Sequence, residues 1–341
     1  MQDLQVKKVK KVVFFGTGGT ISGLSNDSSD VLNYKAGLVK VSDLAQNAFA
    51  PLNGVDGFEP IYEQIAQIDS KDMSFAIWQT LLERLFFWSK DPLVEGFLIT
   101  HGTDTIEETA FFLYLATLDW ENLPTIALTC AMRPASAQDA DGPQNMRDAT
   151  NLLLAPEWRR SGVVVVCAGQ VHHASSVQKI YTDRLDAFSS LPDEPIGQSI
   201  NGMIVKRLPS KVRYSPIDLG IQKPSLQRIL KSGSWPWVEV VQNYAESTGA
   251  LVKALLGFEG PTGQTLAGLV VAGTGIGTVS EELADALEVA KQKGILIWQS
   301  SKCAFAEVKP KEGAPLYDFH GLNPVKARIA LAMHLLALLT A

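Results

Sequence analysis

The sequence predicts an α/β protein of two domains. Apolar, β-branched runs alternate with helical patterns at intervals of roughly 25 to 40 residues, which is the rhythm of βαβ units and a parallel sheet. Polar residues recur where these runs end, as expected if one edge of the sheet carries the functional site. Residues 206–236 show little periodicity and contain four prolines and seven basic residues, which is typical of a linker. We therefore expect an N-terminal α/β domain over 1–205 and a smaller C-terminal α/β domain over 237–341.

The expected strands are short apolar runs, and most of them lead through a polar turn into a helical pattern. In the first domain they lie at 11–15, 61–68, 94–100, 123–129 and 162–168, with helices ending at about 88, 120 and 154. Asn201-Gly202 predicts a hairpin turn between 197–200 and 203–205. In the second domain we expect strands at 238–242, 268–272 and 295–299, and helices at 245–257, 280–293 and 324–339.

Composition and charge exclude several classes of protein. The 341 residues are 46% hydrophobic and carry a net charge of −6, so there is no basic footprint for nucleic acid. The three cysteines are odd in number and lack CxxC spacing, which disfavours a disulfide scaffold or zinc site and favours a reducing compartment. Residues 1–11 are polar and charged, and the apolar run that follows is too short for a signal peptide or membrane span. We expect a soluble, cytoplasmic protein.

A glycine-rich turn, 16–21, directly follows the first expected strand. It contains neither GxxxxGK[ST] nor GxGxxG, which disfavours nucleotide binding. Two interpretations stay open from the residues alone. The glycines let a small ligand approach the backbone and present Thr20 at the strand end, or the threonines of a tight turn cap a helix. Tyr34, near the end of the polar segment that follows, is either the lid residue of a mobile loop or a surface anchor.

The most informative segment is Leu98–Phe112, in which a strand leads into a helix through residues 101–104 (HGTD). Thr105–Glu108 fits the capping-box pattern at the helix start. Thr103 and Asp104 place a hydroxyl beside a carboxylate at the edge of the sheet, where they could react with a ligand and orient it. From this segment alone, the two residues could equally be a helix cap with a nearby acid.

Two other positions carry weaker signals. Asp69 and Ser70 follow the strand at 61–68, and such residues are most often helix N-caps. Lys179 is the only lysine in the polar segment 170–190, where a lone lysine is usually a solvated surface residue.

Several of these segments together resemble the bacterial L-asparaginase family. The most specific is 101–110 (HGTDTIEETA), and 17–21 (TGGTI) is moderately specific. The segments 131–134 (AMRP), 141–145 (DGPQN) and 322–328 (LNPVKAR) occur in the right order, so the likeness spans most of the chain. The same pattern recurs in glutaminase-asparaginases and in an amidotransferase subunit that acts on misacylated tRNA.

The resemblance implies a larger flavodoxin-like N-terminal domain, a smaller C-terminal domain and two side-chain groups around one amide substrate. Thr20 matches the family's nucleophilic threonine, and Tyr34 matches the lid-loop tyrosine that assists it. In the second group, Lys179 and Asp104 polarise Thr103. The family also implies a homotetramer with sites at contacts between subunits, and we expect no cofactor and no metal ion.

The substrate contacts follow from the same resemblance. Ser70 would hold the α-carboxylate of an amino acid amide, and Asp104 would hold its α-ammonium group. Lys71 and Ala131 are further substrate-binding positions. Lys71 stands where relatives more often carry a neutral or acidic residue, so its charge could strengthen carboxylate binding or disturb the ammonium site.

Three further positions depart from the family or align only loosely with it. Cys130 replaces a glycine, and its side chain would either crowd the pocket for the substrate amide or pack inward. Thr278 stands where some members place an asparagine at the contact between subunits. Glu307 is a candidate for the acidic residue that the adjacent subunit contributes.

The expected activity is that of an L-asparaginase, which hydrolyses L-asparagine to L-aspartate and ammonia through a threonine nucleophile. The alternatives are a glutaminase-asparaginase of broader specificity and a catalytically weak amino-acid-binding protein on the same fold. A tRNA-dependent amidotransferase subunit is disfavoured, because it would carry an extra domain and a basic surface.

Overall fold

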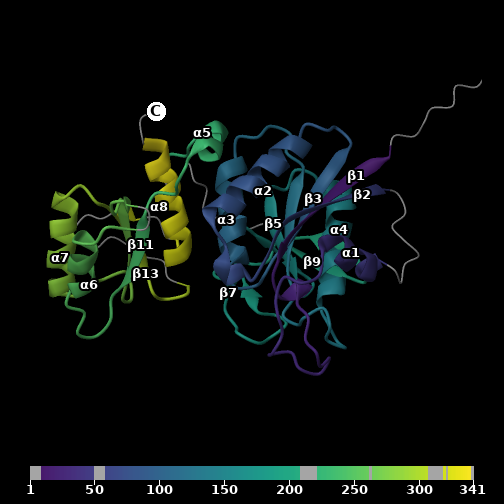
Figure 1. Cartoon of the computed structure of the whole chain (residues 1–341), viewed down its shortest axis with the longest axis horizontal. Coiled ribbons are helices and arrows are strands. Elements are labelled where there is room, and N and C mark those ends of the chain that lie inside the picture. Colours follow the sequence, from purple (N-terminus) through teal and green to yellow (C-terminus); the bar gives the residue numbers. More distant parts are fainter. Residues whose placement is uncertain are drawn as a thin grey trace, which may run out of the picture. The chain divides into compact units, whose positions relative to one another are not determined.

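The computed structural model describes residues 9–49, 58–207, 221–260, 263–305, 318–319 and 322–338. The chain divides into two compact units, Met1–Val212 and Arg213–Ala341 (Figure 1). Each unit has its own sheet and its own core of buried side chains.

The first unit is built on an eight-stranded sheet with the order β10-β9-β6-β5-β4-β3-β1-β2. Five of its strands are parallel: β1 (Lys10–Gly18), β2 (Phe58–Ile68), β3 (Val94–Thr100), β4 (Thr125–Thr129) and β5 (Val163–Cys167). They lie in the order 2-1-3-4-5, which is the flavodoxin-like arrangement. The expected fold class is therefore confirmed.

Helices cover both faces of the parallel strands (Figure 1). One face carries α1 (Val41–Phe49) and α4 (Gly142–Leu154), and the other carries α2 (Phe75–Trp88) and α3 (Ile106–Thr117). Because both of their faces are covered, the inner strands β1, β3, β4 and β5 are continuous apolar runs, whereas the edge strand β2 alternates apolar with polar residues. This explains why the sequence shows them so clearly, for example as the four valines of β5.

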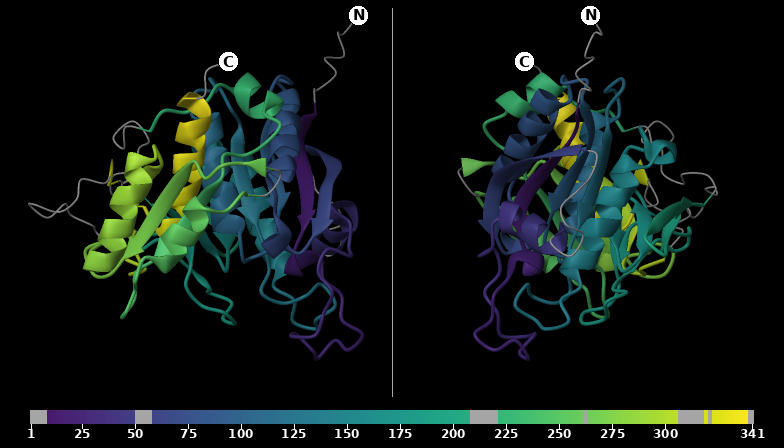
Figure 2. Two further views of the ribbon diagram at one scale, coloured as in Figure 1. Left: turned by 60° about the vertical axis from the view of Figure 1, so that its left-hand side comes forward. Right: turned by 90° about the vertical axis from the view of Figure 1, so that its right-hand side faces the viewer.

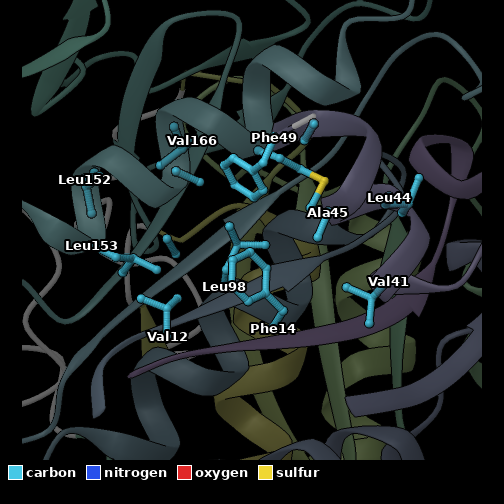
Figure 3. Close-up of a cluster of buried hydrophobic side chains, with 14 of the residues drawn as sticks. Val12, Phe14, Val41, Leu44, Ala45, Phe49, Leu98, Leu152, Leu153 and Val166 are labelled. Carbon is cyan, nitrogen blue, oxygen red and sulfur yellow. The ribbon is translucent and has the colours of Figure 1, made fainter. Parts of the chain in front are cut away.

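The core between the sheet and the α1/α4 face is a cluster of fully packed apolar side chains (Figure 3). Phe14 lies at its centre, with its ring edge-on to Phe49 and stacked on Phe58. Leu98 and Val166 contribute from neighbouring strands of the same sheet, and all five side chains are buried. Truncating a buried phenylalanine of this kind typically costs about 3–5 kcal/mol, so this core holds the strand ends that carry the site in place.

Three further strands extend the sheet beyond β5. They are antiparallel to their neighbours: β6 (Gln170–His173), β9 (Gly197–Ile200) and β10 (Met203–Lys206). Asn201 and Gly202 join β9 to β10 with positive φ angles of 51° and 79°, as a two-residue hairpin turn requires. The predicted hairpin is therefore confirmed.

The second unit has a four-stranded parallel sheet, β11-β12-β13-β14. Its strands are β11 (Val238–Gln242), β12 (Gly268–Gly273), β13 (Leu296–Ser301) and β14 (Asp318–Phe319). Its longer helices are α6 (Ala250–Leu256), α7 (Glu281–Gln292) and α8 (Pro324–Leu338). In the part of the chain that the structure describes, no helix is long and apolar enough to cross a membrane.

One helical prediction needs correction, and one short helix lies where no helix was expected. The helix expected at 245–257 begins only at Ala250, because Glu246 and Gly249 have positive φ angles of 62° and 69° and cannot continue a right-handed helix. The segment expected as a linker, 206–236, contains helix α5 (Leu226–Lys231), which is capped by the Ser225 hydroxyl. Residues 208–220 of that segment lie outside the described residues.

Candidate active site

The segments that follow β1 and β4 leave the sheet at the same edge (Figure 2), and the backbone N–H of Ser25 donates to the Ser136 hydroxyl at 2.8 Å. The turns after β1 and β3 touch at two glycines of this edge. A Cβ at Gly19 would lie 2.2 Å from the Cα of Gly102, and the φ angle of Gly19 is 82°. Only glycine is compatible with such a contact. Because these two glycines immediately precede Thr20 and Thr103, the contact brings the two predicted groups together.

Thr20 begins a short 3-10 turn, Thr20–Ser22, directly after β1. Its hydroxyl is 2.7 Å from the hydroxyl of Tyr34, and either atom could be the donor. At the end of the polar loop, Lys35 pairs with Leu24 in an isolated antiparallel β-bridge. This pairing places Tyr34 beside the turn Thr20–Ser22. The two residues expected to form the first group are therefore hydrogen-bonded neighbours.

Lys179 lies beside the turn after β3 and contacts both predicted partners. Its ammonium group donates to the Thr103 hydroxyl at 2.8 Å and to the Asp104 carboxylate at 2.6 Å. The Thr103 hydroxyl in turn donates to Asp104 at 3.4 Å. The side chain of Asp104 is 56% exposed and that of Lys179 only 18%, so the carboxylate keeps a face toward solvent while the lysine lies beneath it.

The predicted substrate-binding residues take different positions. Ser70 is buried against Gly102, where an added Cβ would lie 2.5 Å from the Ser70 hydroxyl. Lys71 is exposed and pairs with Asp69 and Asp72. The hydrogen bond to Asp69 raises the pKa of Lys71, and the charges of Asp69, Asp72 and Asp104 add to this effect.

Ala131 is buried in the core cluster, and the backbone beside it is fixed by Asp141. The Asp141 carboxylate accepts hydrogen bonds from the N–H groups of Met132 and Arg133, both at 3.0 Å. Asn145 donates to the carbonyl of Cys130 at 2.9 Å and accepts from the N–H of Ala168 at 3.0 Å. These side chains tie the ends of β4 and β5 together.

Cys130 packs inward beside Cys167, at the end of the neighbouring strand, and both thiols are buried. Hydrogen bonding with Cys167 and burial raise the pKa of the Cys130 thiol. Of the two orientations expected for this side chain, the structure has the inward one. Thr278, in the second unit, bonds with its hydroxyl to the carbonyl of Thr274 at 3.1 Å, and Glu307 lies outside the described residues.

The predicted capping box at the start of α3 is wrong. Thr105 makes no side-chain cap, because its hydroxyl turns away from the helix and donates to the carbonyl of Ser70 at 2.7 Å. The Asp69 carboxylate, in contrast, does accept from the N–H of Lys71 and caps the short turn Ser70–Asp72. Thr105 therefore joins the turns after β2 and β3 instead of capping a helix.

A buried chain of hydrogen bonds lies beneath the turn after β3, and sequence reasoning did not find it. The His101 ring bonds through Nδ1 to the carbonyl of Gly102 and through Nε2 to the Thr109 hydroxyl, both at 2.8 Å. The indole of Trp78 donates to Thr109 at 2.9 Å. A carbonyl only accepts and an indole only donates, so Nδ1 of His101 carries the proton and the Thr109 hydroxyl donates to Nε2. Burial lowers the pKa of His101 to about 4.

This arrangement suits one class of chemistry. A threonine hydroxyl beside a phenol can act as an activated nucleophile, and a second threonine held by a lysine and a carboxylate can handle a proton or orient water. Among the described residues, no group of three or more histidine, cysteine, aspartate or glutamate side chains could hold a metal ion. Such a pair of hydroxyl groups at one edge of an α/β sheet suits a hydrolase.

Comparisons with known proteins give the family. The family model described as "Asparaginase, N-terminal" matches residues 11–211, and "Glutaminase/Asparaginase C-terminal domain" matches 237–338. L-asparaginase 2 of Escherichia coli is 32% identical over 95% of this chain and 88% of its own length. Glutaminase-asparaginase of Pseudomonas fluorescens biotype A is 32% identical over 96% and 86%. The crystal structure of a probable cytoplasmic L-asparaginase from Campylobacter jejuni matches with a TM-score of 0.80 and 30% identity, over 95% of this chain and 94% of that one. The chain belongs to the asparaginase family.

Proposed function

We propose that the protein hydrolyses the side-chain amide of L-asparagine to L-aspartate and ammonia, with Thr20 as the nucleophile. One observation supports this most directly. Thr20, which pairs with Tyr34, and Thr103, which Lys179 and Asp104 hold, stand on turns that touch at the residues preceding the two threonines.

In the proposed mechanism the Thr20 Oγ1 attacks the amide carbon of the substrate. Its proton passes to the Tyr34 hydroxyl, 2.7 Å away, while the phenolic proton of Tyr34 passes to the amide nitrogen, which leaves as ammonia. A water molecule then hydrolyses the Thr20 ester, and the Thr103 group orients that water. The N–H of Gly19 already donates to the carbonyl of Ile68, so we assign oxyanion stabilisation to the N–H groups of Thr20 and Thr103.

Specificity for a free amino acid amide would come from its two charged ends. Ser70 and Lys71 would receive the α-carboxylate, and the exposed face of Asp104 would receive the α-ammonium group. Asp104 then has two roles, because the same carboxylate pairs with Lys179. Discrimination of this kind can be large, since an analogue that lacks one charge leaves a polar group of the site without its partner.

Removal of each hydroxyl tests the mechanism. Thr20→Ala and Thr103→Val should each lower kcat for asparagine by roughly 10³-fold or more, because both hydroxyls act in the transition state. Thr103→Ser, which keeps the hydroxyl, is the matched control, and circular dichroism reports whether the fold is kept. Near-native turnover by Thr103→Val would remove the second group from the mechanism. Stabilisation of the wild type by asparagine without any ammonia release would indicate a binding protein instead.

A glutaminase-asparaginase of broader specificity is the second candidate. It is favoured by the Pseudomonas fluorescens relative, whose 32% identity equals that of the Escherichia coli asparaginase. The two candidates differ in one ratio, kcat/KM for asparagine over kcat/KM for glutamine. We expect this ratio to be at least about 10, because one additional methylene in a fitted pocket changes kcat/KM by about 10- to 200-fold. A ratio near one would support the second candidate.

We also propose that the protein acts in the cytoplasm as a homotetramer. The cytoplasmic assignment is supported by the likeness to the probable cytoplasmic enzyme of Campylobacter jejuni and by the unpaired cysteines, although a relative from Haemophilus influenzae is described as periplasmic. The proposed domain boundaries are 1–205 and 237–341, and they are supported by family matches over 11–211 and 237–338.

A further inference from the structure

A buried carboxylate that the mechanism does not use holds the backbone of Lys179. Glu107 lies in the first turn of α3, three residues after Asp104, and its side chain is buried. Its Oε2 atom accepts a hydrogen bond from the backbone N–H of Lys179 at 2.6 Å, across 72 positions of the chain. Such a bond between a carboxylate and a backbone N–H is charge-assisted and stronger than a neutral one.

Lys179 needs an anchor because its own strand is minimal. It lies in β7 (Gln178–Lys179), which pairs with β8 (Phe188–Ser189) in a separate two-stranded sheet. A slip of one residue in such a pairing would turn the lysine side chain to the opposite face. This ladder, which the bond from the Ile180 N–H to the Ala187 carbonyl at 2.8 Å extends, gives little resistance to that slip by itself, since a two-stranded hairpin is marginally stable alone.

Glu107 restrains the backbone of Lys179, and it lies at the start of helix α3, beside the turn that carries Thr103 and Asp104. Thr103 and Asp104 form the turn that opens α3, and Glu107 follows within the first helical turn. Lys179 is thus fixed to one rigid segment at two points, by its backbone on Glu107 and by its ammonium group on Thr103 and Asp104. The three residues that bond Lys179 thus lie within residues 103–107, so their spacing does not depend on the relative position of two separate loops.

We propose that Glu107 is a positioning residue for the amide-cleaving reaction, which sets the register of β7 and so places the Lys179 ammonium group against Thr103. This inference rests on the proposed role of Lys179. Because Glu107 acts through the geometry of the lysine, its loss should reduce kcat and leave the substrate-binding residues in place. A displacement of about 1 Å at a catalytic group can reduce the rate 10²-fold.

The experiment compares three variants of Glu107 in the full-length protein. Glu107→Gln keeps an oxygen acceptor of the same length and should retain kcat within about threefold of wild type. Glu107→Asp withdraws the acceptor by one methylene, and Glu107→Leu removes it. Both should lower kcat for asparagine by about 10- to 100-fold, with KM changed less than about threefold. Glu108→Leu, one position further along the same helical turn, controls for loss of negative charge at the helix start and should stay within about threefold of wild type.

Lys179→Met separates this inference from the proposed mechanism. If Lys179→Met is as active as wild type, the role proposed for the lysine is wrong, whatever Glu107 does. If Lys179→Met is inactive while Glu107→Asp and Glu107→Leu keep wild-type kcat, the positioning role of Glu107 is overturned. A change confined to KM, or an equal loss in Glu107→Gln and Glu107→Leu, would overturn it as well.

The double variant Glu107→Asp with Lys179→Met should be no slower than Lys179→Met alone, because the two residues act as one unit. Should Glu107→Leu fail to fold, the contrast between Glu107→Gln and Glu107→Asp decides the question.

Discussion

Thr20 and Thr103 are both threonines at strand ends, but their partners suit them to different tasks. The Thr103 hydroxyl accepts from an ammonium group at 2.8 Å, which draws electron density from its oxygen and weakens it as a nucleophile. Thr20 instead shares one short hydrogen bond with a phenol, which can accept the threonine proton while donating its own. The residue pairing thus favours Thr20 for attack and Thr103 for orienting water or exchanging a proton through Lys179.

His101 shows how strongly the site depends on a group that cannot itself react with substrate. Its ring is fully buried and neutral, since burial lowers its pKa to about 4 from an ordinary value near 6.5. Its Nδ1–H donates to the carbonyl of Gly102, the residue that contacts Gly19. The ring therefore supports the closest contact between the two turns of the site.

The lowered pKa of His101 predicts how stability depends on pH. Between pH 6.5 and 4 the unfolded chain binds a proton at His101 and the folded protein does not, so the free energy of unfolding falls as the pH falls through this window. The stabilisation is complete above pH 6.5, and the slope due to His101 is at most about 1.4 kcal/mol per pH unit.

Urea unfolding of wild type and His101→Gln between pH 4 and pH 7.5 measures this effect. The variant should be less stable at pH 7, yet its free energy of unfolding should fall less steeply between pH 6.5 and 4. The carboxylates are common to both proteins, so the difference in slope isolates the histidine. Parallel profiles for the two proteins would show that His101 is not the group responsible.

At the scale of elements, α3 organises the site. Its first turn carries Glu107, and its next turn carries Thr109, which links His101 to Trp78 of α2. The helix therefore connects three parts of the first unit: the turn after β3, the short strand β7 and the neighbouring helix. Helix α3 is buried over nearly all its length, so packing fixes the position of the residues that it carries.

The chain from Trp78 to Thr109 to His101 predicts a graded response to substitution. Thr109→Val removes the donor to His101 Nε2 and also the acceptor of the Trp78 indole, which should cost about 2–4 kcal/mol because both groups are buried. Trp78→Phe leaves the bond from Thr109 to His101 intact, so it should affect kcat less than Thr109→Val.

Unfolding free energies and kcat for asparagine test this order, with Thr109→Ser as the matched control that keeps the hydroxyl. Loss of activity in Trp78→Phe equal to that in Thr109→Val would contradict it. In that case the packing of α2 on α3, where the Trp78 ring stacks on Phe112, would matter more than the hydrogen bonds.

The sequence predicts the elements of this fold best where both faces of a strand are buried. The inner parallel strands of the first unit, β1, β3, β4 and β5, appear as apolar runs, which locate them to within about three residues. The sequence does not predict helices α1 and α5, because α1 follows a long polar loop and α5 is a single short helix inside a proline-rich segment. The start of α6 depends on the positive φ of Glu246 and Gly249, which no apolar pattern encodes.

Part of the site is predictable because its residues follow strands that the sequence predicts. Thr20, Ser70 and Thr103 each follow a parallel strand, so their meeting at one edge of the sheet follows from topology. Lys179 is different, because it lies 76 positions from Thr103 on a two-residue strand, and only the family resemblance points to it. Glu107 and Thr109 are buried polar residues at the start of a largely apolar helix, and that contrast is the signal that could have revealed them.

At the scale of the whole molecule, one unit supplies every predicted catalytic side chain. Thr20, Tyr34, Thr103, Asp104 and Lys179 all belong to Met1–Val212, and their hydrogen bonds are made within one chain. The second unit has a separate parallel sheet and core. The hydrogen bonds that position the predicted catalytic groups are thus made without the second unit.

The proposed homotetramer makes activity depend on assembly, because the family resemblance places the sites at contacts between subunits and expects an acidic residue from the adjacent one. Light scattering after size exclusion should give about four times the chain mass of 37.0 kDa. Specific activity should fall on dilution at the same concentration at which the mass falls, since a lone chain would keep Thr20–Tyr34 and Thr103–Lys179 but lose the contribution of its neighbour. Thr103→Ser, assayed in parallel, should dissociate at the same concentration as wild type, because Thr103 is bonded within its own chain. A dilute monomer with full activity per chain would show that each subunit carries a complete site, and the proposed role of the assembly in catalysis would be wrong.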